Sequence, residues 1–469
     1  MELTEKNLNR NILSLAVPAA VENLLYMMVF ITDTMFMAWV GTKQLAGVDI
    51  SAMIAGILML FVMAVSTAAM SLVARHIGAK KQREAEQIAG QALSLGFVAA
   101  VLVAAPVMIF APQLLRLMGL EPAVVAFGVI YLRTVMLTAG FRQIISGGCS
   151  TLRGAGDTRT PMFITLIMNI VNIAAAYLLV LGKFGFPRLE VRGAAYAANL
   201  ASLVGAGLVL FVLLRGRRAI QVHLRDVFSF HRPALAMLIR IGLPAGLDMF
   251  AMRISFLLYY RIIASLGTDA LAANAVALRV ESLSFMPGMG IAMAAATLVG
   301  QSLGAGQVGL AEKSLKRCTW MAGALMAVLG LVLLVAARPV SALFVADPKM
   351  IALSALCIQI SAFEQPLLGF VMVYMGGLRG AGDTLSAMMV TLICSTLVRL
   401  PVVFFLAITL HLGLVGAWLG AVVDWAFRSV VVYWIARRGR WKRIKVDISA
   451  APVPAEEIVT ETVAIPPAS

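Results

Sequence analysis

Charge, cysteine and histidine are all scarce in this sequence. Only 13% of its 469 residues are charged, whereas about a quarter is ordinary for a soluble domain, so a water-soluble globular fold is excluded. The four cysteines, Cys149, Cys318, Cys357 and Cys394, stand in or beside apolar stretches without metal-binding or redox spacing, which predicts small buried hydrophobic residues. The four histidines fall in loops or near expected helix ends. The His/Asp/Ser constellation of an intramembrane hydrolase is therefore missing, and we expect neither an enzyme nor a metal site.

What the sequence has instead is many long runs of apolar residues. Hydrophobic residues make up 61% of the chain, and the mean hydropathy is +0.93. Runs long enough to cross about 30 Å of hydrocarbon recur along almost the whole chain, and no cleavable leader opens it, so the first run is expected to be retained. We predict an all-α integral membrane protein with twelve transmembrane helices, at residues 12–38, 47–73, 87–112, 123–149, 160–182, 193–214, 235–263, 270–300, 314–338, 350–377, 385–410 and 413–436.

The net charge of +15 could indicate a nucleic-acid-binding protein, but its distribution does not. Of the 38 Lys and Arg residues, 24 lie in or next to the terminal segments and the loops after even-numbered spans, against 7 at the opposite loops and 7 within spans. This asymmetry follows the positive-inside rule. We therefore expect a plasma (inner) membrane protein with cytoplasmic N- and C-termini, whose partner is the lipid bilayer and not a nucleic acid.

The sequence repeats itself at an offset of 226 residues. Pro18 falls on Pro244, and Leu152-Arg-Gly-Ala-Gly-Asp-Thr158 falls on the identical Leu378-Arg-Gly-Ala-Gly-Asp-Thr384. Each half holds an even number of spans, so the halves keep the same orientation. We predict two six-helix bundles related by a pseudo-twofold axis along the membrane normal.

The repeat also divides the chain. We predict an N-terminal six-helix lobe at 1–220, a cytoplasmic linker at 221–240 that runs into the seventh helix, a C-terminal lobe at 241–445 and a disordered tail at 446–469. Two similar lobes that rock about a central cavity suit alternating access. The duplication therefore favours a transporter, expected to be a monomer without a cofactor. A duplicated scaffold without transport and a membrane enzyme are the alternatives.

Over nearly its full length the chain resembles the bacterial multidrug and toxic compound extrusion (MATE) family. The resemblance rests on the paired Leu-Arg-Gly-Ala-Gly-Asp-Thr loops, on Ile31-Thr-Asp33-Thr34 leading to Gly41, and on Leu278-Arg-Val-Glu281-Ser-Leu-Ser-Phe-Met-Pro287 and Leu298–Ala305. It implies a V-shaped pair of bundles that exports organic, often cationic, small molecules in exchange for protons or sodium ions.

Three positions depart from the family pattern. Archaeal members carry an Asp about four residues after an Asn of the fifth helix; here Asn172 matches the Asn, but Ala176 stands at the acid position. Sodium-coupled members carry a Glu where this chain has Met252, and an Asp where it has Leu368. Neither cation site transfers intact. The resemblance therefore favours H+ over Na+ as the coupling ion, unless other acids of the second half form a different cage.

The repeated loop motif has a physical reading of its own. Gly154 and Gly156 permit tight or left-handed backbone at the end of a helix, and Arg153 suits a helix C-terminus that faces the inner leaflet. Asp157 and the threonine after it can cap the helix that follows. We interpret the motif as a structural hinge rather than a substrate contact. The same roles fall on Arg379, Gly380 and Asp383.

Acids within spans are functional candidates, because an ionisable group there is costly unless it is paired or wet. Glu22, Tyr26 and Asp33 lie on one face of the first helix. A low-dielectric cavity favours the neutral form of a carboxyl group, as proton coupling requires, and the family resemblance places the first-helix coupling acid at Asp33. We predict Asp33 as an ion-coupling residue, with Glu22, Tyr26 and Asn172 lining the substrate cavity.

The corresponding stripe of the second half holds Asp248 and Tyr259, which we assign to the same cavity, although Asp248 could instead be a solvated charge near a helix end. Glu281 and Glu364 are predicted as ion-coupling residues, either with a shared role or paired with membrane arginines. A proline close to each glutamate can break the local hydrogen-bond ladder and expose carbonyl groups to a cation. These prolines are Pro287 and Pro366.

Arginines within the spans are unusually many. They are Arg133, Arg142, Arg253, Arg261, Arg279, Arg399 and Arg428. Arg428 follows Asp424 by four residues, which predicts an ion pair within one helix. The others keep an anionic or zwitterionic substrate open. The alternatives to a drug exporter are a lipid-linked saccharide or amphiphile flippase, a major facilitator and a membrane enzyme.

Overall fold

The computed structural model describes residues 3–216 and 220–444, and these residues form helices without any strand. The predicted tail at 446–469 lies outside the described residues. The helices of the first half are α1 (Leu8–Val40), α2 (Thr42–Leu58), α3 (Leu60–Gly78), α4 (Gln82–Arg116), α5 (Pro122–Met136), α6 (Ala139–Gly154), α7 (Arg159–Leu181) and α8 (Glu190–Arg215). After the short α9 (Leu224–Phe228) come α10 (Arg232–Ala264), α11 (Thr268–Gly304), α12 (Val308–Ala342), α13 (Pro348–Gly380), α14 (Thr384–Thr391), η1 (Leu392–Arg399), α15 (Leu400–Phe404), η2 (Phe405–Thr409), α16 (Gly413–Arg438) and α17 (Arg440–Arg443).

The prediction of twelve spans is confirmed, with two of them bent. Among the described residues, 10 helices are long and apolar enough to cross a membrane, and two bent pairs bring the number to 12. The pair α2 and α3 is bent by 51°, and the pair α5 and α6 by 54°. Both had been predicted as straight spans. All four cysteines are buried and unpaired, as expected.

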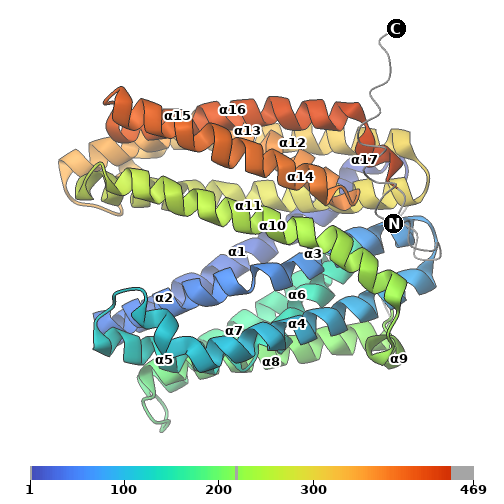
Figure 1. The fold of residues 1–469 in the computed structure, drawn as a ribbon, viewed down its shortest axis with the longest axis horizontal. Coiled ribbons are helices and arrows are strands. Elements are labelled where there is room, and N and C mark those ends of the chain that lie inside the picture. Colours follow the sequence, from blue (N-terminus) through green and yellow to red (C-terminus); the bar gives the residue numbers. More distant parts are fainter. Residues whose placement is uncertain (1–2, 217–219, 445–469) are drawn as a thin grey trace.

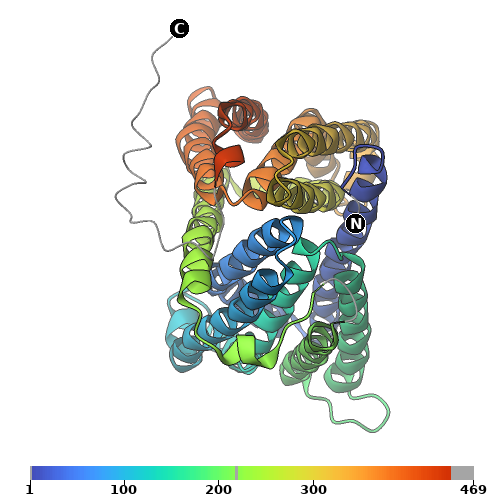
Figure 2. The same ribbon diagram turned by 90° about the vertical axis from the view of Figure 1, so that its right-hand side faces the viewer.

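The spans form two six-helix bundles (Figure 1), as predicted. We name the bundle of α1–α8 the N-lobe and that of α10–α16 the C-lobe. In Figure 2, turned by 90°, α1 (dark blue) runs along the right edge of the molecule and α10 (yellow-green) along the left edge, so one helix crosses between the bundles at each edge. The two lobes have the same order of helices, because each is one copy of the repeat.

The first helix of each lobe begins inside the other lobe. Leu8, Ile12 and Leu15 of α1 are buried in a core made otherwise by C-lobe helices. Their repeat partners in α10 are buried in an N-lobe core; these are Ala234, Leu238 and Ile241. Burial of each large apolar side chain in the other lobe contributes about 1.5–3 kcal/mol of stabilising free energy. It therefore fastens the two lobes to each other at one end.

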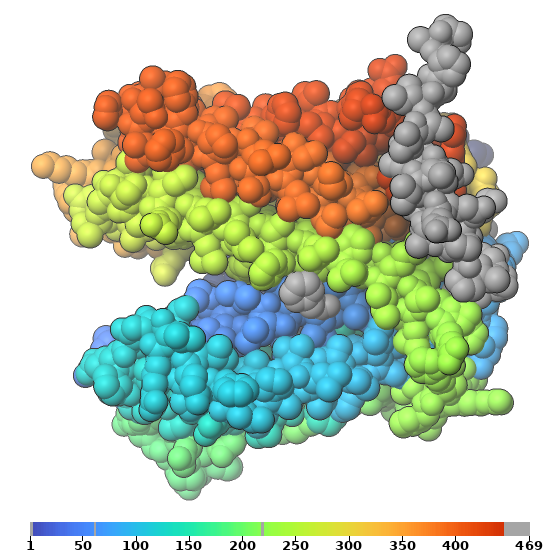
Figure 3. Space-filling view, viewed as in Figure 1, coloured from blue at the N-terminus to red at the C-terminus, as the bar shows by residue number. Residues whose placement is uncertain are grey.

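We call this the closed end, defined by the last residues of α3 and α11, Gly78 and Gly304. The described termini lie there too, since Glu5 pairs with Lys313 at 2.7 Å and the Ile444 carbonyl accepts a hydrogen bond from Arg75. At the opposite, open end the lobes separate, and Figure 3 shows the cleft between them opening to the left. The molecule is therefore V-shaped, with one end sealed.

The helices do not end at Pro287 and Pro366. Both prolines lie inside continuous helices, α11 and α13. The backbone departs from the α-helix instead around Pro401, where the π-helical segments η1 and η2 flank α15. A membrane helix can continue through a proline where neighbouring helices satisfy the backbone groups that the proline leaves without a partner. The irregular backbone thus lies beside Arg399 and not beside the glutamates.

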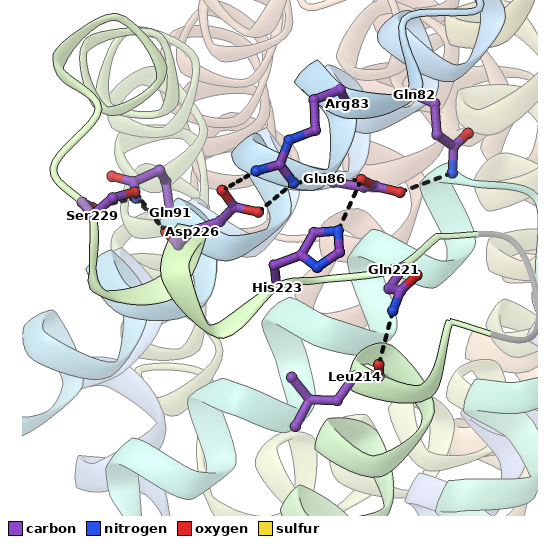
Figure 4. A network of polar contacts seen from close by, with 9 residues as sticks. All are labelled: Gln82, Arg83, Glu86, Gln91, Leu214, Gln221, His223, Asp226 and Ser229. Carbon is purple, nitrogen blue, oxygen red and sulfur yellow. Dashed lines mark hydrogen bonds and ion pairs between the residues drawn. The ribbon is translucent and has the colours of Figure 1, made fainter.

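The segment between the lobes is fixed to the N-lobe (Figure 4). Asp226 of α9 is buried and accepts two hydrogen bonds of 2.7 Å from the Arg83 guanidinium of α4. Gln91 of α4 donates to the backbone carbonyls of Asp226 and Ser229, both at 2.6 Å. A bidentate arginine–carboxylate contact fixes orientation as well as position. α9 is therefore held against α4, and the attachment continues to His231, whose backbone N–H donates to Gln91 Oε1 at 3.2 Å.

Candidate functional site

The two halves carry the same buried ion pair. Arg153 Nη1 lies 2.8 Å from Glu22 Oε1, and in the second half Arg379 Nη2 lies 2.5 Å from Asp248 Oδ2. Both acids are at most 2% exposed. The loop arginines therefore neutralise the two acids that we had placed on the cavity wall. Asp248 is thus paired rather than solvated.

The other residues of the loop motif fix the backbone next to these ion pairs. Asp157 accepts a hydrogen bond from the Thr160 backbone N–H at 3.0 Å, and Asp383 does the same for Ser386 at 3.2 Å, which confirms the predicted caps. Gly154 permits close packing, because a Cβ there would lie 2.5 Å from the Met70 carbonyl oxygen. Gly380 has the same role, 2.1 Å from the Ala296 carbonyl oxygen. The left-handed residues are Gly156 and Gly382.

A set of cross-lobe hydrogen bonds seals the closed end. Thr297 and Gln301 of α11 donate to the terminal carbonyls of α6, at Arg153 (3.0 Å) and Gly154 (2.9 Å). In the mirrored contact, Ser71 and Arg75 of α3 donate to the terminal carbonyls of α13. Those acceptors are Gly380 (3.1 Å) and Ala381 (3.2 Å). Because the last carbonyls of a helix lack partners within it, each lobe completes the loop-motif helix of the other.

Two glycines bring the same helices into contact. A Cβ on Gly78 would lie 2.0 Å from the Gln301 carbonyl oxygen, and one on Gly304 would lie 1.9 Å from the Arg75 carbonyl oxygen. The two contacts are related by the repeat, since 78 + 226 = 304 and 75 + 226 = 301. The pseudo-twofold axis therefore passes between α3 and α11 at this point. No side chain larger than hydrogen fits at either position while the end is closed.

Asp33 lies in the N-lobe about 16 Å from Glu22 along α1, toward the open end. It is partly exposed, and its Oδ1 is buried without a hydrogen-bond partner. The charge that acts on it is the Arg142 guanidinium of α6. Asn172 of α7 is buried, and its Oδ1 also lacks a partner. Tyr26 is 44% exposed between the two acids of α1.

The structure brings Glu281 of α11 and Glu364 of α13 together. The two carboxyl groups act electrostatically on each other, and Glu364 is 1% exposed, with an Oε2 atom that has no hydrogen-bond partner among the described residues. Two neighbouring carboxyl groups in a buried site disfavour the state in which both are ionised. The pair is therefore a candidate site for binding and releasing a proton.

One arginine, Arg399, acts on this pair, and within the described residues neither glutamate forms an ion pair. Arg399 acts electrostatically on both glutamates, and its guanidinium lies 5.2 Å from the Tyr259 ring centre. Nearby, Arg428 pairs with Asp424 at 2.8 Å, which confirms the predicted i, i+4 contact. With every group ionised the three acids and two arginines sum to 2 − 3 = −1, so one proton or monovalent cation makes the cluster neutral.

Tyr259 is placed differently from its expected position on the cavity wall. It is only 2% exposed and donates a hydrogen bond to Asn274 Oδ1 at 3.0 Å. Its ring is part of the apolar core at the open end of the C-lobe. Tyr259 therefore supports Arg399 from within the core.

Sequence reasoning missed the four donors of the seal, Ser71, Arg75, Thr297 and Gln301. A buried serine or threonine in a span carries no distinctive pattern of its own. The repeat contained the signal, because Ser71 falls on Thr297 and Arg75 on Gln301. Both pairs keep a hydrogen-bond donor at the same position of the repeat.

Comparison with known proteins agrees with the repeat. The MatE family model matches residues 18–178 and again 244–405, and the two matches begin 244 − 18 = 226 residues apart. A probable multidrug resistance protein NorM of Thermotoga maritima is 31% identical over 441 residues, which cover 93% of this chain and 94% of that protein. An uncharacterised transporter, YisQ of Bacillus subtilis, is 26% identical over 424 residues, covering 90% and 93%.

Solved structures share the fold. A MATE structure in the bent conformation has a TM-score of 0.86 at 22% identity, covering 92% of this chain and 95% of that one. A MOP superfamily transporter from Pyrococcus furiosus, described as having a binding pocket of reversed polarity, has a TM-score of 0.86 at 21% identity, covering 93% and 97%.

Proposed function

This chain belongs to the multidrug and toxic compound extrusion family of membrane transporters, and we propose that it is a cation-coupled antiporter that exports hydrophobic organic compounds. The observation that carries the proposal is the duplicated bundle, open at one end and sealed at the other by contacts that obey the repeat. Such a molecule can exchange one opening for the other by rocking its lobes.

The proposed coupling ion is the proton. Glu281 and Glu364 are neighbouring carboxyl groups, which disfavours ionisation of both, and with every group ionised the cluster that they form with Asp424, Arg399 and Arg428 carries one net negative charge that a bound proton would neutralise. Asp33 offers a second, separate carboxyl group in the N-lobe. Met252 and Leu368 remain apolar at the positions where sodium-coupled members have acids. We therefore favour H+ over Na+.

The substrate is proposed to be a hydrophobic organic molecule. Glu22 and Asp248 are each neutralised by an arginine, so Asp33 is an acid left to attract a cation in the N-lobe. The relatives named as multidrug resistance proteins support a drug-like substrate. The buried arginines keep an anionic amphiphile, such as a lipid-linked saccharide, as the second candidate.

The remaining parts of the proposal concern placement. We propose that the protein lies in the plasma (inner) membrane as a monomer without a cofactor, with the closed end in the cytoplasm because the basic loops cluster there. The proposed lobe boundaries are 1–220 and 241–445. The docked α9 supports a boundary after it, since α9 belongs physically to the N-lobe.

The proposal is tested with inverted membrane vesicles that contain the protein. Cationic, neutral and anionic compounds are offered in turn, with a proton or a sodium gradient imposed separately. We expect a pH gradient alone to drive accumulation of hydrophobic organic cations or neutral compounds. Accumulation driven only by sodium would replace the proposed ion, and uptake of none of the compounds under either gradient would contradict the proposed function.

Glu281→Gln and Glu364→Gln are each expected to uncouple transport from the pH gradient. Glutamine keeps the size of the side chain and is neutral, but it cannot bind and release a proton. Gradient-driven accumulation should fall to the level of empty vesicles, while exchange of labelled for unlabelled substrate without a gradient continues. Glu121→Gln is the matched control, because Glu121 is exposed and paired with Lys43. Unchanged accumulation in both variants would rule out the coupling role.

A further inference from the structure

α12 carries an exposed basic groove at the closed end. The groove has a volume of about 470 Å³ and lies between the start of α1 and the first turns of α12. Its polar lining comes from Glu5, just before α1, from Asn9 of α1, and from Lys313, Lys316, Arg317 and Trp320 of α12.

The charges of the groove do not cancel. Lys313 is neutralised by Glu5 at 2.7 Å. Arg317 donates from Nε to the neutral Asn9 Oδ1 at 2.7 Å, so its charge remains. Within residues 3–216 and 220–444, Lys316 makes no hydrogen bond or ion pair. The groove therefore presents two uncompensated positive charges.

The N-lobe has no equivalent of this surface. The repeat aligns Lys316, Arg317 and Trp320 with Gly90, Gln91 and Ser94 of α4. That face of α4 is covered by α9, to which Gln91 donates two hydrogen bonds. No described segment covers the face of α12 in the same way. The second copy has therefore exchanged a protein-covered neutral face for an open cationic one.

The level of the groove along α12 is that of the lipid headgroups. With 35 residues, α12 is about 52 Å long and extends about 10 Å beyond each side of a 30 Å hydrocarbon layer. Lys316 lies about 12 Å from the start of the helix. Trp320 is 68% exposed, and the Arg317 guanidinium lies 5.8 Å from its ring centre. Exposed tryptophan is typical of the membrane interface.

The same face continues as apolar surface toward the middle of the membrane. Val328, Leu331 and Val335 follow Trp320 at helical spacing and are 60%, 61% and 77% exposed. A cationic groove above an exposed apolar stripe matches a ligand with an anionic head and long acyl chains. We propose that Lys316 and Arg317 bind the phosphate headgroup of an anionic membrane lipid, with its acyl chains along Val328 to Val335.

The test compares phosphatidylglycerol with phosphatidylcholine on the full-length protein in detergent, with the amount of bound lipid measured by native mass spectrometry. We expect the wild type to prefer phosphatidylglycerol, and Lys316→Gln/Arg317→Gln to lose about tenfold in affinity for it. Lys80→Gln/Arg440→Gln removes two exposed cations elsewhere and should bind like the wild type. Size-exclusion chromatography checks that each variant is folded.

Three outcomes would overturn the proposal. Equal binding of phosphatidylglycerol by the Lys316→Gln/Arg317→Gln variant and the wild type would remove the site. If soluble glycerol phosphate binds to the protein as well as phosphatidylglycerol does, the site binds a free phosphate and not a lipid. If lipid binds only after deletion of residues 446–469, which carry Asp447, Glu456, Glu457 and Glu461, the groove is occupied by this acidic segment instead.

Discussion

Asp33→Asn is expected to reduce pH-driven accumulation of substrate to the level of vesicles without the protein. Asn keeps the size of the side chain and its carbonyl oxygen, but it cannot carry a proton through the transport cycle. Asp33 Oδ1 is buried without a hydrogen-bond partner among the described residues, so Asn breaks no hydrogen bond of that oxygen and removes only the charge that interacts with Arg142. The effect should therefore fall on coupling rather than on folding.

The measurement is dye accumulation in inverted vesicles under an imposed pH gradient, repeated at several pH values. Asp269→Asn is the matched control, because Asp269 is an exposed acid in the first turn of α11. The control should behave like the wild type. If Asp33→Asn transports normally, or shows the same pH dependence as the wild type, the coupling role of Asp33 is wrong.

The helices could be predicted because membrane spans are set by length and apolar content. The bends could not, because no proline marks them: α2 ends and α3 begins around Met59, and α5 gives way to α6 at Leu137 and Thr138. At Pro287 the opposite happened, and the helix stayed whole. Packing against neighbouring helices decides both cases, and single-sequence patterns do not contain that packing.

The candidate site was predictable as a set of residues but not as a set of partners. The repeat preserves an acid at Glu22 and Asp248 and an arginine at Arg153 and Arg379, with the same separation of 131 residues in each half. A conserved separation between opposite charges would have indicated the ion pairs. The contact of Glu281 with Glu364 had no such signal, because their counterparts in the first half are Ala55 and Thr138.

These pairs connect the cavity to the seal. Arg153 holds Glu22 with its guanidinium and accepts the Thr297 hydrogen bond with its carbonyl. A change in the charge of Glu22 would therefore act on a residue that also joins the two lobes. The proposed coupling acids lie away from the seal, Asp33 in the N-lobe and Glu281 and Glu364 in the C-lobe. The seal is the place where a change of charge in either lobe would act on contacts between the lobes.

The seal itself gives the second large effect: Gly78→Leu/Gly304→Leu is expected to abolish transport. Each new side chain would meet a carbonyl oxygen at 2.0 or 1.9 Å from its Cβ. Overpacking typically costs about 1–3 kcal/mol at each site, and about 1.4 kcal/mol already shifts a population tenfold. In the variant, α3 and α11 should therefore remain separated at the end that is closed in the wild type. The lobes then cannot complete the transport cycle. Each lobe is untouched, so the variant should still fold and insert.

Spin labels at Lys80→Cys and Gln307→Cys report the separation of the lobes at this end by pulsed electron resonance, since the native cysteines are buried. The double leucine variant should show only the separated population, whereas the wild type should include the close one. Gly309→Leu is the matched control, because a Cβ there meets nothing within 4 Å. Normal transport by the double variant, or an unchanged distance between the labels, would mean that the two glycines do not control closure, and the seal would then have to depend on the four side-chain donors alone.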